Sequence, residues 1–459
     1  MPPANPTLDA AKSFAVSPWV SAAVLLAVLP LGSARAQPSC PSLPPPAGAT
    51  IEVTPAQADD LRAIVAGAAA GTTILLHDGV YAMDAGDAVS RLVFATPGVT
   101  LRSLSGNRDG VVLDGNYQTN ELIAIQASNV VIADLTLREA YDHPIHVAGN
   151  PAPITGTVLH NLRVVDPGQQ AIKINPVGQG WADSGTIECS AIELTDAGRP
   201  FVRDNCYTGG IDAHAAWGWV VRRNRISGFW CPAGLSEHAI HFWNASRDTL
   251  VEENVIVNCA RGVGFGLLEV SGDRAYPDDP YPGVGYLGHI DGVIRNNFIA
   301  AADPDLLQSG SGFDAGIALE QSRNTWVMHN SVASTAAPFS SIEWRFANTL
   351  VQLVNNLVTH NLRARDGNPQ AVLAGNLEGA QLGWFQSIPQ GDLHLVALVG
   401  GALPPVDAGA AVAAGLADRD IDREARPAAR DIGADEVVAP LFADGFESGN
   451  PNAWSVVVP

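Results

Sequence analysis

A short strand pattern, two apolar residues flanking one variable residue, recurs seven times and constrains the fold more than any other feature of the sequence. Its copies begin at Ile145, Ile172, Ile211, Ile240, Val263, Ile317 and Ile342. Such alternation is typical of a β-strand with one face in a core, so the middle residue and the residue two positions further point to the other face. The copies therefore predict two rows of side chains on one surface.

A second series of small polar residues alternates with these strands. Its members are Asp134, Asn161, Ser190, Asn224, Asn254, Asn297, Asn330 and Asn356. They lie 27, 29, 34, 30, 43, 33 and 26 residues apart, which predicts a solenoid whose coils stack on one another. Asn tolerates a left-handed backbone, and its amide can bond to the same residue of the next coil, so we expect a ladder at a corner between strands.

The two series, with little helical periodicity between them, predict an all-β fold: a single-stranded, right-handed parallel β-helix of about ten coils over residues 51–405. Thr54 as N-cap and Pro55 in the first turn predict a helix that covers the open end before the first coil. We expect the stack to continue to about Leu395 and an irregular tail over residues 406–459.

The amino-terminal residues 1–36 have the pattern of a signal peptide. Lys12 precedes an apolar run over residues 20–31, which is too short to span a membrane, and Ala34-Arg-Ala36 fits a cleavage site. A Pro-rich leader follows over residues 37–50. We therefore expect a soluble protein without a membrane span that is secreted, periplasmic or held at the cell surface.

Five cysteines in an exported protein indicate disulfides. Cys231 and Cys259 follow equivalent positions of neighbouring coils and are candidates for one bridge, Cys189 and Cys206 are candidates for a second, and Cys40 is left over. The cysteines lack the spacing of metal ligands, so the sequence gives no indication of zinc.

Acidic side chains strongly outnumber basic ones. Without residues 1–36 the chain has 24 basic and 46 acidic side chains, a net charge of −22. This balance argues against nucleic acid or an anionic membrane as partner. The negative charge also repels acidic polysaccharides unless cations intervene, which makes Ca²⁺ a candidate cofactor. Nothing in the sequence indicates an oligomer, so we expect a monomer.

Over residues 50–400 the repeat resembles the right-handed parallel β-helix, or pectin lyase-like, superfamily. Asp431-Ile-Gly-Ala-Asp-Glu436 resembles the closing motif of exported bacterial β-helix proteins, and residues 442–448 resemble a short carboxy-terminal segment of exported proteins. Many members act on polysaccharides, whereas others are adhesins. The resemblance thus implies a β-helix whose partner is a polysaccharide substrate or glycan ligand.

Stacked coils lie about 4.8 Å apart, which brings the outward residues of successive strands together. The first predicted row is His146, Lys173, Asp212, His241, Gly264, Ala318 and Glu343. The second is Ala148, Asn175, His214, Trp243, Gly266, Glu320 and Arg345. Any one histidine has a ready explanation as a surface or ladder residue, but so many titratable groups on one patch favour a binding or catalytic face. We expect a hollow at Gly264 and groove walls from residues 176–185 and 268–290.

The leading function hypothesis is a polysaccharide lyase that acts by β-elimination on a uronate-containing glycan. This reaction needs a base at C5, a group that neutralises the carboxylate and a proton donor. Lys173 or His241 is the predicted base, His214 its partner and Asp212 an orienting residue or calcium ligand. We expect Lys173→Ala to lower turnover by about 10²–10⁴-fold, the usual contribution of a general base, but to leave folding nearly untouched, because the side chain faces outwards.

The predicted substrate-binding residues are His146, Asn175, Trp243, Glu320, Glu343 and Arg345. Two alternatives remain at this stage. In the first, Glu320 and Glu343, about 8 Å apart by strand geometry, form the pair of an inverting glycoside hydrolase, whose carboxyl groups lie about 6.5–9.5 Å apart. In the second, the protein is a non-catalytic, adhesin-type glycan-binding surface protein.

Overall fold

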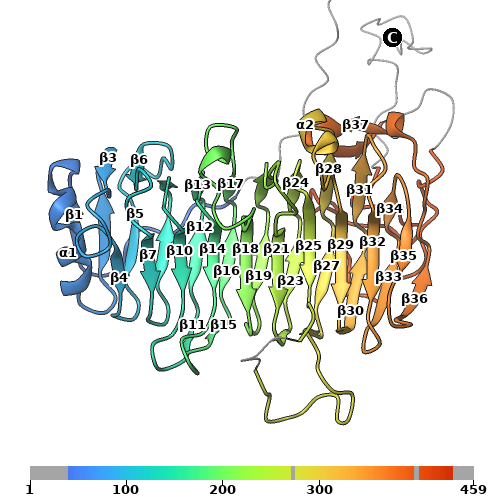
Figure 1. The fold of residues 1–459 in the computed structure, drawn as a ribbon, viewed down its shortest axis with the longest axis horizontal. Coiled ribbons are helices and arrows are strands. Elements are labelled where there is room, and N and C mark those ends of the chain that lie inside the picture. The colour runs from blue at the N-terminus through green and yellow to red at the C-terminus, as the bar shows by residue number, and fades with distance from the viewer. Residues whose placement is uncertain (1–39, 270–273, 397–402, 438–459) are drawn as a thin grey trace, which may run out of the picture. The chain divides into compact units, whose positions relative to one another are not determined.

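The computed structural model describes residues 40–269, 274–396 and 403–437. The predicted signal peptide and the segment 442–448 lie outside the described residues. The compact unit that begins at Cys40 is built almost entirely of short parallel strands (Figure 1). It is a right-handed parallel β-helix, as predicted.

A typical coil contributes one strand to each of three sheets, and two coils add a second short strand to sheet A. Sheet A contains β1 (Thr50–Val53), β2 (Thr73–Leu76), β5 (Thr100–Ser103), β8 (Val131–Ala133), β12 (Val158–His160), β16 (Thr186–Glu188), β19 (Val220–Arg222), β22 (Ser246–Arg247), β23 (Leu250–Glu252), β26 (His289–Ile290), β27 (Val293–Arg295), β30 (Ser322–Met328), β33 (Leu350–Val354) and β36 (Gln370–Ala374). Sheet B contains β3 (Gly79–Ala82), β6 (Val111–Asp114), β9 (Thr136–Arg138), β13 (Arg163–Val165), β17 (Ala191–Glu193), β20 (Arg225–Ser227), β24 (Val255–Val257), β28 (Phe298–Ala301), β31 (Ser331–Ser334) and β34 (Leu357–Val358). Sheet C contains β4 (Leu92–Phe94), β7 (Glu121–Ile125), β10 (His143–Val147), β14 (Gln170–Ile174), β18 (Gly209–His214), β21 (His238–Trp243), β25 (Arg261–Phe265), β29 (Ala315–Glu320), β32 (Ser340–Arg345) and β35 (Leu362–Ala364).

The core is a stack of the apolar anchors that the sequence repeats. In sheet C, Ile145, Ile172, Ile211 and Ile240 occupy successive coils and are fully buried. Burying one such side chain stabilises the fold by about 1.5–3 kcal/mol. The ten strands of sheet C correspond to the predicted number of coils.

The predicted Asn ladder is present at the corner between sheets A and B. The Oδ1 atom of Asn254 accepts the backbone N–H of Asn224 at 3.0 Å and its Nδ2–H at 3.1 Å, and the same pattern continues through Asn297 and Asn330. The backbone expectation was wrong in detail: Asp134 and Asn161 are left-handed, but from the third rung towards the carboxyl end the left-handed residue precedes the ladder residue, as at Cys189 (φ 62°) and Arg223 (φ 55°). The amide itself sits on an ordinary backbone and is free to bond along the stack.

The predicted amino-terminal helix exists, but it does not precede the first strand. It comprises η1 (Pro55–Asp60) and α1 (Leu61–Gly67), and it follows β1, which already pairs with β2. η1 contacts β3 and α1 contacts β4, so the helix covers the ends of sheets B and C (Figure 1). Leu61 and Val65 are buried in the core and close it.

Beyond β36 the chain folds back along the solenoid. η3 (Leu382–Trp384), η4 (Ile388–Gln390) and the antiparallel pair β37 (Phe385–Ser387) and β38 (Asp392–Leu395) pack against β28. α2 (Pro304–Gln308) follows β28. Residues 403–437 contain neither helix nor strand, yet they are well packed: Arg426, buried, pairs with Glu436 at 2.8 Å and donates to the carbonyl oxygens of Gly433 and Ala434 at 3.0 Å.

The predicted disulfide pairs were wrong. The bonds are Cys40–Cys189 and Cys206–Cys231, while Cys259 is a buried free thiol. Cys259 points into the core and therefore cannot reach Cys231, whereas Cys206 and Cys231 lie in facing loops with Cα atoms 5.8 Å apart. Residues 40–48 cross the outer face of sheet A from β16 to β2, held by Cys189 and by Arg102, whose Nη1 donates to Pro44 O at 3.0 Å.

A short two-stranded sheet, β11 (Ile154–Thr155) with β15 (Ala182–Asp183), extends from one edge of the solenoid. Among the described residues, no helix combines the length and the apolar character that a membrane crossing requires.

Candidate active site

The register of sheet C places both predicted rows as expected. His146, Lys173, Asp212, His241, Gly264, Ala318 and Glu343 are consecutive partners across β10, β14, β18, β21, β25, β29 and β32. His214 pairs with Trp243, and Glu320 with Arg345. Their environment differs from the expectation, because Lys173, Asp212, His241, Glu320 and Glu343 are each less than a tenth exposed.

Lys173 lies at the centre of this face. Its ammonium contacts the Oδ2 atom of Asp212 and lies 3.0 Å from both the hydroxyl of Tyr207 and the Nε2 atom of His214. These three partners use all three N–H donors of the ammonium group. The same Nε2 atom of His214 also lies 3.3 Å from Asp212 Oδ2. In the tautomer with its proton on Nδ1 the imidazole accepts from Lys173, and in the other tautomer its Nε2–H donates to Asp212.

The charge states follow from these contacts. Burial lowers the pKa of Lys173, but the carboxylate of Asp212 outweighs burial and the net pKa is raised. Burial raises the pKa of Asp212, but Lys173 and His214 outweigh it and hold that pKa well below its ordinary value. Lys173 therefore rests as an ammonium, which disfavours its predicted role as the base. The expectation that Lys173→Ala leaves folding nearly untouched assumed an exposed side chain, but Lys173 is buried and its removal would leave a buried carboxylate without its cation.

His214 and Trp243 are half-buried and form the solvent side of the cluster. Burial lowers the pKa of His214, and the opposing carboxylate of Asp212 only partly restores it, so the imidazole stays neutral at pH 7. The Nε1–H of Trp243 donates to Asp212 Oδ1 at 2.7 Å, and its ring stacks on His241 at 5.5 Å. Trp243 thus fixes the carboxylate, while its predicted contact with a sugar ring stays a prediction.

Sequence reasoning missed Tyr207, because it lies in the connection before β18 and outside the repeat. It is half-buried and follows Cys206 directly. The disulfide to Cys231 ties this loop to the next one, which leads into β21. A cysteine beside a tyrosine in an inserted connection was the available signal.

A second group of titratable side chains surrounds His241. Its Nδ1 atom lies 3.5 Å from Glu237 Oε2 and 4.0 Å from Asp212 Oδ1, and its Nε2–H donates to Gly266 O at 3.1 Å. His238 stacks near it with ring centroids 4.4 Å apart. His238 begins the strand that carries His241, and Glu237 directly precedes that strand. Both lie before the apolar anchor Ile240, outside the two predicted rows. His238 also fills the hollow predicted at Gly264, where an added Cβ would lie 2.7 Å from its Nε2.

His146 and Asn175 form a separate pair towards the amino end of sheet C. His146 Nδ1 lies 2.6 Å from Glu121 Oε1, and His146 Nε2 lies 2.5 Å from Asn175 Oδ1. Glu121, which the sequence analysis did not single out, also pairs with Arg91 at 3.2 Å. A cavity of about 200 Å³ opens here, bounded by these side chains together with Ala148 and Val177.

The carboxylates of the hydrolase alternative are each paired with arginine. Glu320 lies 3.5 Å from Arg345, which also binds Asp366 at 2.6 Å. Glu343 binds Arg365 at 2.6 Å and accepts from Ser340. Burial raises the pKa of Glu320, although Arg345 opposes this. Both carboxylates are thus engaged within the protein.

The two predicted wall segments meet at one edge of the solenoid. Arg274 binds both carboxylate oxygens of Asp183, at 2.7 and 2.9 Å, and donates to Ala215 O at 3.1 Å. Its guanidinium also lies over the rings of Trp181 and Tyr276. A cavity of about 350 Å³ lies within the second segment, between Tyr276, Tyr286 and Ile290.

No family model and no curated protein matches this sequence. Solved structures match at the level of fold. An alginate lyase from Paenibacillus sp. str. FPU-7 is 15% identical, with 72% of this chain and 99% of that chain aligned at a TM-score of 0.49. The pectate lyase Pel9A is 13% identical, with 85% and 96% aligned at 0.47. The tailspike protein of E. coli bacteriophage HK620, solved with a pentasaccharide, is 12% identical, with 68% and 55% aligned at 0.46.

These identities and TM-scores concern the fold and leave the activity open. The sheet topology described above leads to one conclusion by itself: the protein is a right-handed parallel β-helix.

Proposed function

We propose that the protein is an exported polysaccharide lyase that cleaves a uronate-containing glycan by β-elimination on the outer face of sheet C. The observation that carries this proposal is the cluster around Lys173, where an ammonium contacts a carboxylate, a phenol and a neutral imidazole. An ammonium next to a proton donor and a proton acceptor is what elimination beside a carboxylate needs. The two disulfides support an oxidising compartment.

The proposed roles follow from protonation state and exposure. The substrate carboxylate takes over one N–H of Lys173, which frees the Nε2 lone pair of His214 for the C5 proton. The bond from C4 to the leaving oxygen breaks, the C4–C5 double bond forms, and Tyr207 gives its proton to the leaving oxygen. Lys173 lies 3.0 Å from that hydroxyl and stabilises the resulting phenolate. Asp212 and Trp243 position the ammonium and the imidazole.

Binding of an acidic glycan to a chain with a net charge of −21 requires local compensation. Arg91 beside the 200 Å³ cavity supplies positive charge at one end of the proposed groove. We retain Ca²⁺ as a cation that accompanies the substrate, and we propose that the protein acts as a monomer. The role of Ca²⁺ is tested by comparing activity in calcium with activity in a chelator. The monomeric state is tested by light scattering.

The test is turnover on a panel of polyuronates, followed by the absorbance of unsaturated uronate ends. Tyr207→Phe and His214→Gln should each lower kcat by about 10²–10⁴-fold, the usual contribution of a general acid or base. Arg222→Ala on sheet A, an exposed charge on another face, is the matched control and should keep full activity. Because His214 must be neutral and burial lowers its pKa below the ordinary value of 6.5, activity should persist somewhat below pH 6.5 and fall as the pH drops through that lowered pKa.

Other outcomes would reject the lyase. Release of reducing ends without absorbance would favour the hydrolase, whose supporting observation is the raised pKa of Glu320, a property of general acids. Glycan binding without any turnover would favour the adhesin-type protein. Full activity of both Tyr207→Phe and His214→Gln would show that the reaction occurs elsewhere.

A further inference from the structure

A group of potential metal ligands beside the Lys173 cluster has no role in the proposed elimination. Glu237, His238 and His241 each offer one ligand atom, and the three atoms lie within 4.8 Å of one another. His238 and His241 are almost fully buried, and Glu237 is partly exposed at the entrance. All three belong to β21 or to the residue just before it, so one strand fixes their spacing.

His238 is buried without any hydrogen bond. Neither its Nδ1 nor its Nε2 has a partner, although the side chain is only 2% exposed. A buried polar group without a partner costs about 1–3 kcal/mol, so such a group in a native protein indicates a partner that the polypeptide does not supply. The ring lies flat over Gly264, where no side chain larger than hydrogen fits, and this places it beside His241.

His241 has the hydrogen-bonding pattern of a metal ligand. Its Nε2–H donates to a backbone carbonyl, that of Gly266, at 3.1 Å, which leaves the lone pair on Nδ1. That lone pair makes no hydrogen bond, and it faces the carboxylates of Glu237 and Asp212 at 3.5 and 4.0 Å. Two carboxylates that face this nitrogen favour a positive charge between them. Neighbouring positive charges are already neutralised, since Lys173 pairs with Asp212 and Arg261 lies 3.5 Å from Asp314.

From these observations we infer that Glu237, His238 and His241 bind a divalent transition metal of the zinc class. Two imidazoles and one carboxylate suit Zn²⁺ or Co²⁺, whereas Ca²⁺ and Mg²⁺ require oxygen ligands. Three protein ligands leave one position open, which is the arrangement of zinc sites that bind a water or a substrate atom. The sequence-based expectation against zinc rested on the spacing of the cysteines, and no cysteine belongs to this site.

The inference does not depend on the proposed elimination, and its test needs no substrate. The metal-free protein, with residues 1–36 removed, is titrated with Zn²⁺ by calorimetry and with Co²⁺ by visible absorption. We expect one ion per chain at this site, an absorption band of four-coordinate Co²⁺, and a higher melting temperature with Zn²⁺. Ca²⁺ at the same concentration should produce none of these effects.

Three variants assign the site. Glu237→Gln and His241→Gln should each weaken Zn²⁺ binding by at least about 100-fold, because removing a ligand costs more than the 10–100-fold of an outer partner. Glu237→Gln preserves shape and lies at the surface, so it keeps the test valid if the buried histidine variants misfold. His77→Gln removes an exposed histidine that pairs only with Glu52 and should leave binding unchanged.

Two results would overturn the inference. One is an absence of micromolar Zn²⁺ binding to the unmodified protein. The other is binding that survives Glu237→Gln and His241→Gln but disappears in His394→Gln, because His394 forms another histidine and carboxylate group with Asp422 and Asp435. Binding lost in Glu237→Gln and retained in both His77→Gln and His394→Gln would support it.

Discussion

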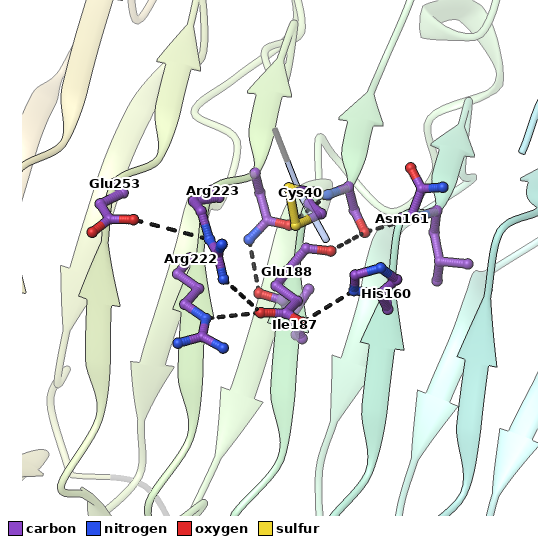
Figure 2. The surroundings of a disulfide bond; sticks show 12 residues. Cys40, His160, Asn161, Ile187, Glu188, Arg222, Arg223 and Glu253 are labelled. Atoms are coloured by element: carbon purple, nitrogen blue, oxygen red, sulfur yellow. Dashed lines mark hydrogen bonds and ion pairs between the residues drawn. A yellow bond between two sulfur atoms is a disulfide. The ribbon is translucent and has the colours of Figure 1, made fainter. Parts of the chain in front are cut away.

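Two faces of the same solenoid carry columns of charged side chains, and they differ in how completely those charges are paired. On sheet A, Glu188 accepts from His160 at 3.0 Å, Arg222 at 2.8 Å and Arg223 at 3.0 Å, and Arg223 also reaches Glu253 at 3.9 Å (Figure 2). On sheet C, the ammonium of Lys173 is enclosed with Asp212, and His238 has no partner at all.

The comparison separates a structural ladder from a candidate site. Rows of charged side chains occur on both faces, so a row of charge by itself does not show whether a face is a structural ladder or a functional site. The sheet A network lies beside a disulfide and satisfies its central carboxylate from three sides, so it contributes to the stability of the stack (Figure 2). On sheet C, burial and missing partners indicate groups retained for something other than stability.

The largest expected effect is on Lys173. Lys173→Ala leaves the Asp212 carboxylate buried without its cation and should destabilise the fold by about 3–5 kcal/mol. Urea unfolding followed by circular dichroism measures this. The double variant Lys173→Ala/Asp212→Ala should recover part of the loss, whereas purely additive losses would show that the two groups are not coupled.

A smaller effect is expected at Gly264, where an added Cβ would lie 2.7 Å from the His238 ring. Gly264→Ala should displace that ring and cost about 1–3 kcal/mol, the usual price of overpacking. It should also weaken Zn²⁺ binding if His238 is a ligand. Unchanged stability together with unchanged Zn²⁺ binding would mean that the ring moves away freely.

On sheet A, the hydrogen bond from His160 lowers the pKa of Glu188 from 4.5 to about 2, with Arg222 and Arg223 acting in the same direction against burial. A carboxylate whose pKa is depressed in the folded state stabilises the fold above pH 4.5, and this stability is lost as the pH falls from 4.5 towards 2. Because Glu188 is partly exposed, we expect only about 1 kcal/mol. Melting temperatures of Glu188→Gln and the unmodified protein should differ at pH 6 and converge near pH 2.

The smallest effect is expected for Arg222→Ala. The Arg222 side chain is 38% exposed, and Glu188 keeps Arg223 and His160 as partners. The change in unfolding free energy should stay within about 0.5 kcal/mol, as for most surface ion pairs. A loss as large as that of Lys173→Ala would erase the distinction between the two faces.

Sequence reasoning reached the column order of sheet C because strand register is encoded in the repeat itself. Ile172 and Ile211 point inwards, so Lys173 and Asp212 must become neighbours on the outside. The burial and the protonation states of these side chains could not be predicted from the repeat. They depend on Tyr207 and on the loop held by Cys231, and both lie in connections that do not repeat from coil to coil. The disulfide of Cys40 could not be foreseen either, because it joins positions 149 residues apart.

The segment from Cys40 to Gly48 gives the solenoid an asymmetric resistance to tension. Apart from the Cys206–Cys231 disulfide between neighbouring loops, coils are held to one another by strand pairing and packing, so a force along the axis would separate them one at a time. Between β2 and β16 the force is carried by the Cys40–Cys189 disulfide instead of by the strands. Thr50, which follows the bonded segment, is paired with β2 and so connects the disulfide to the first coils. A protein pulled from its carboxyl end should therefore unravel down to the coil of Cys189 and stop there until the disulfide is reduced.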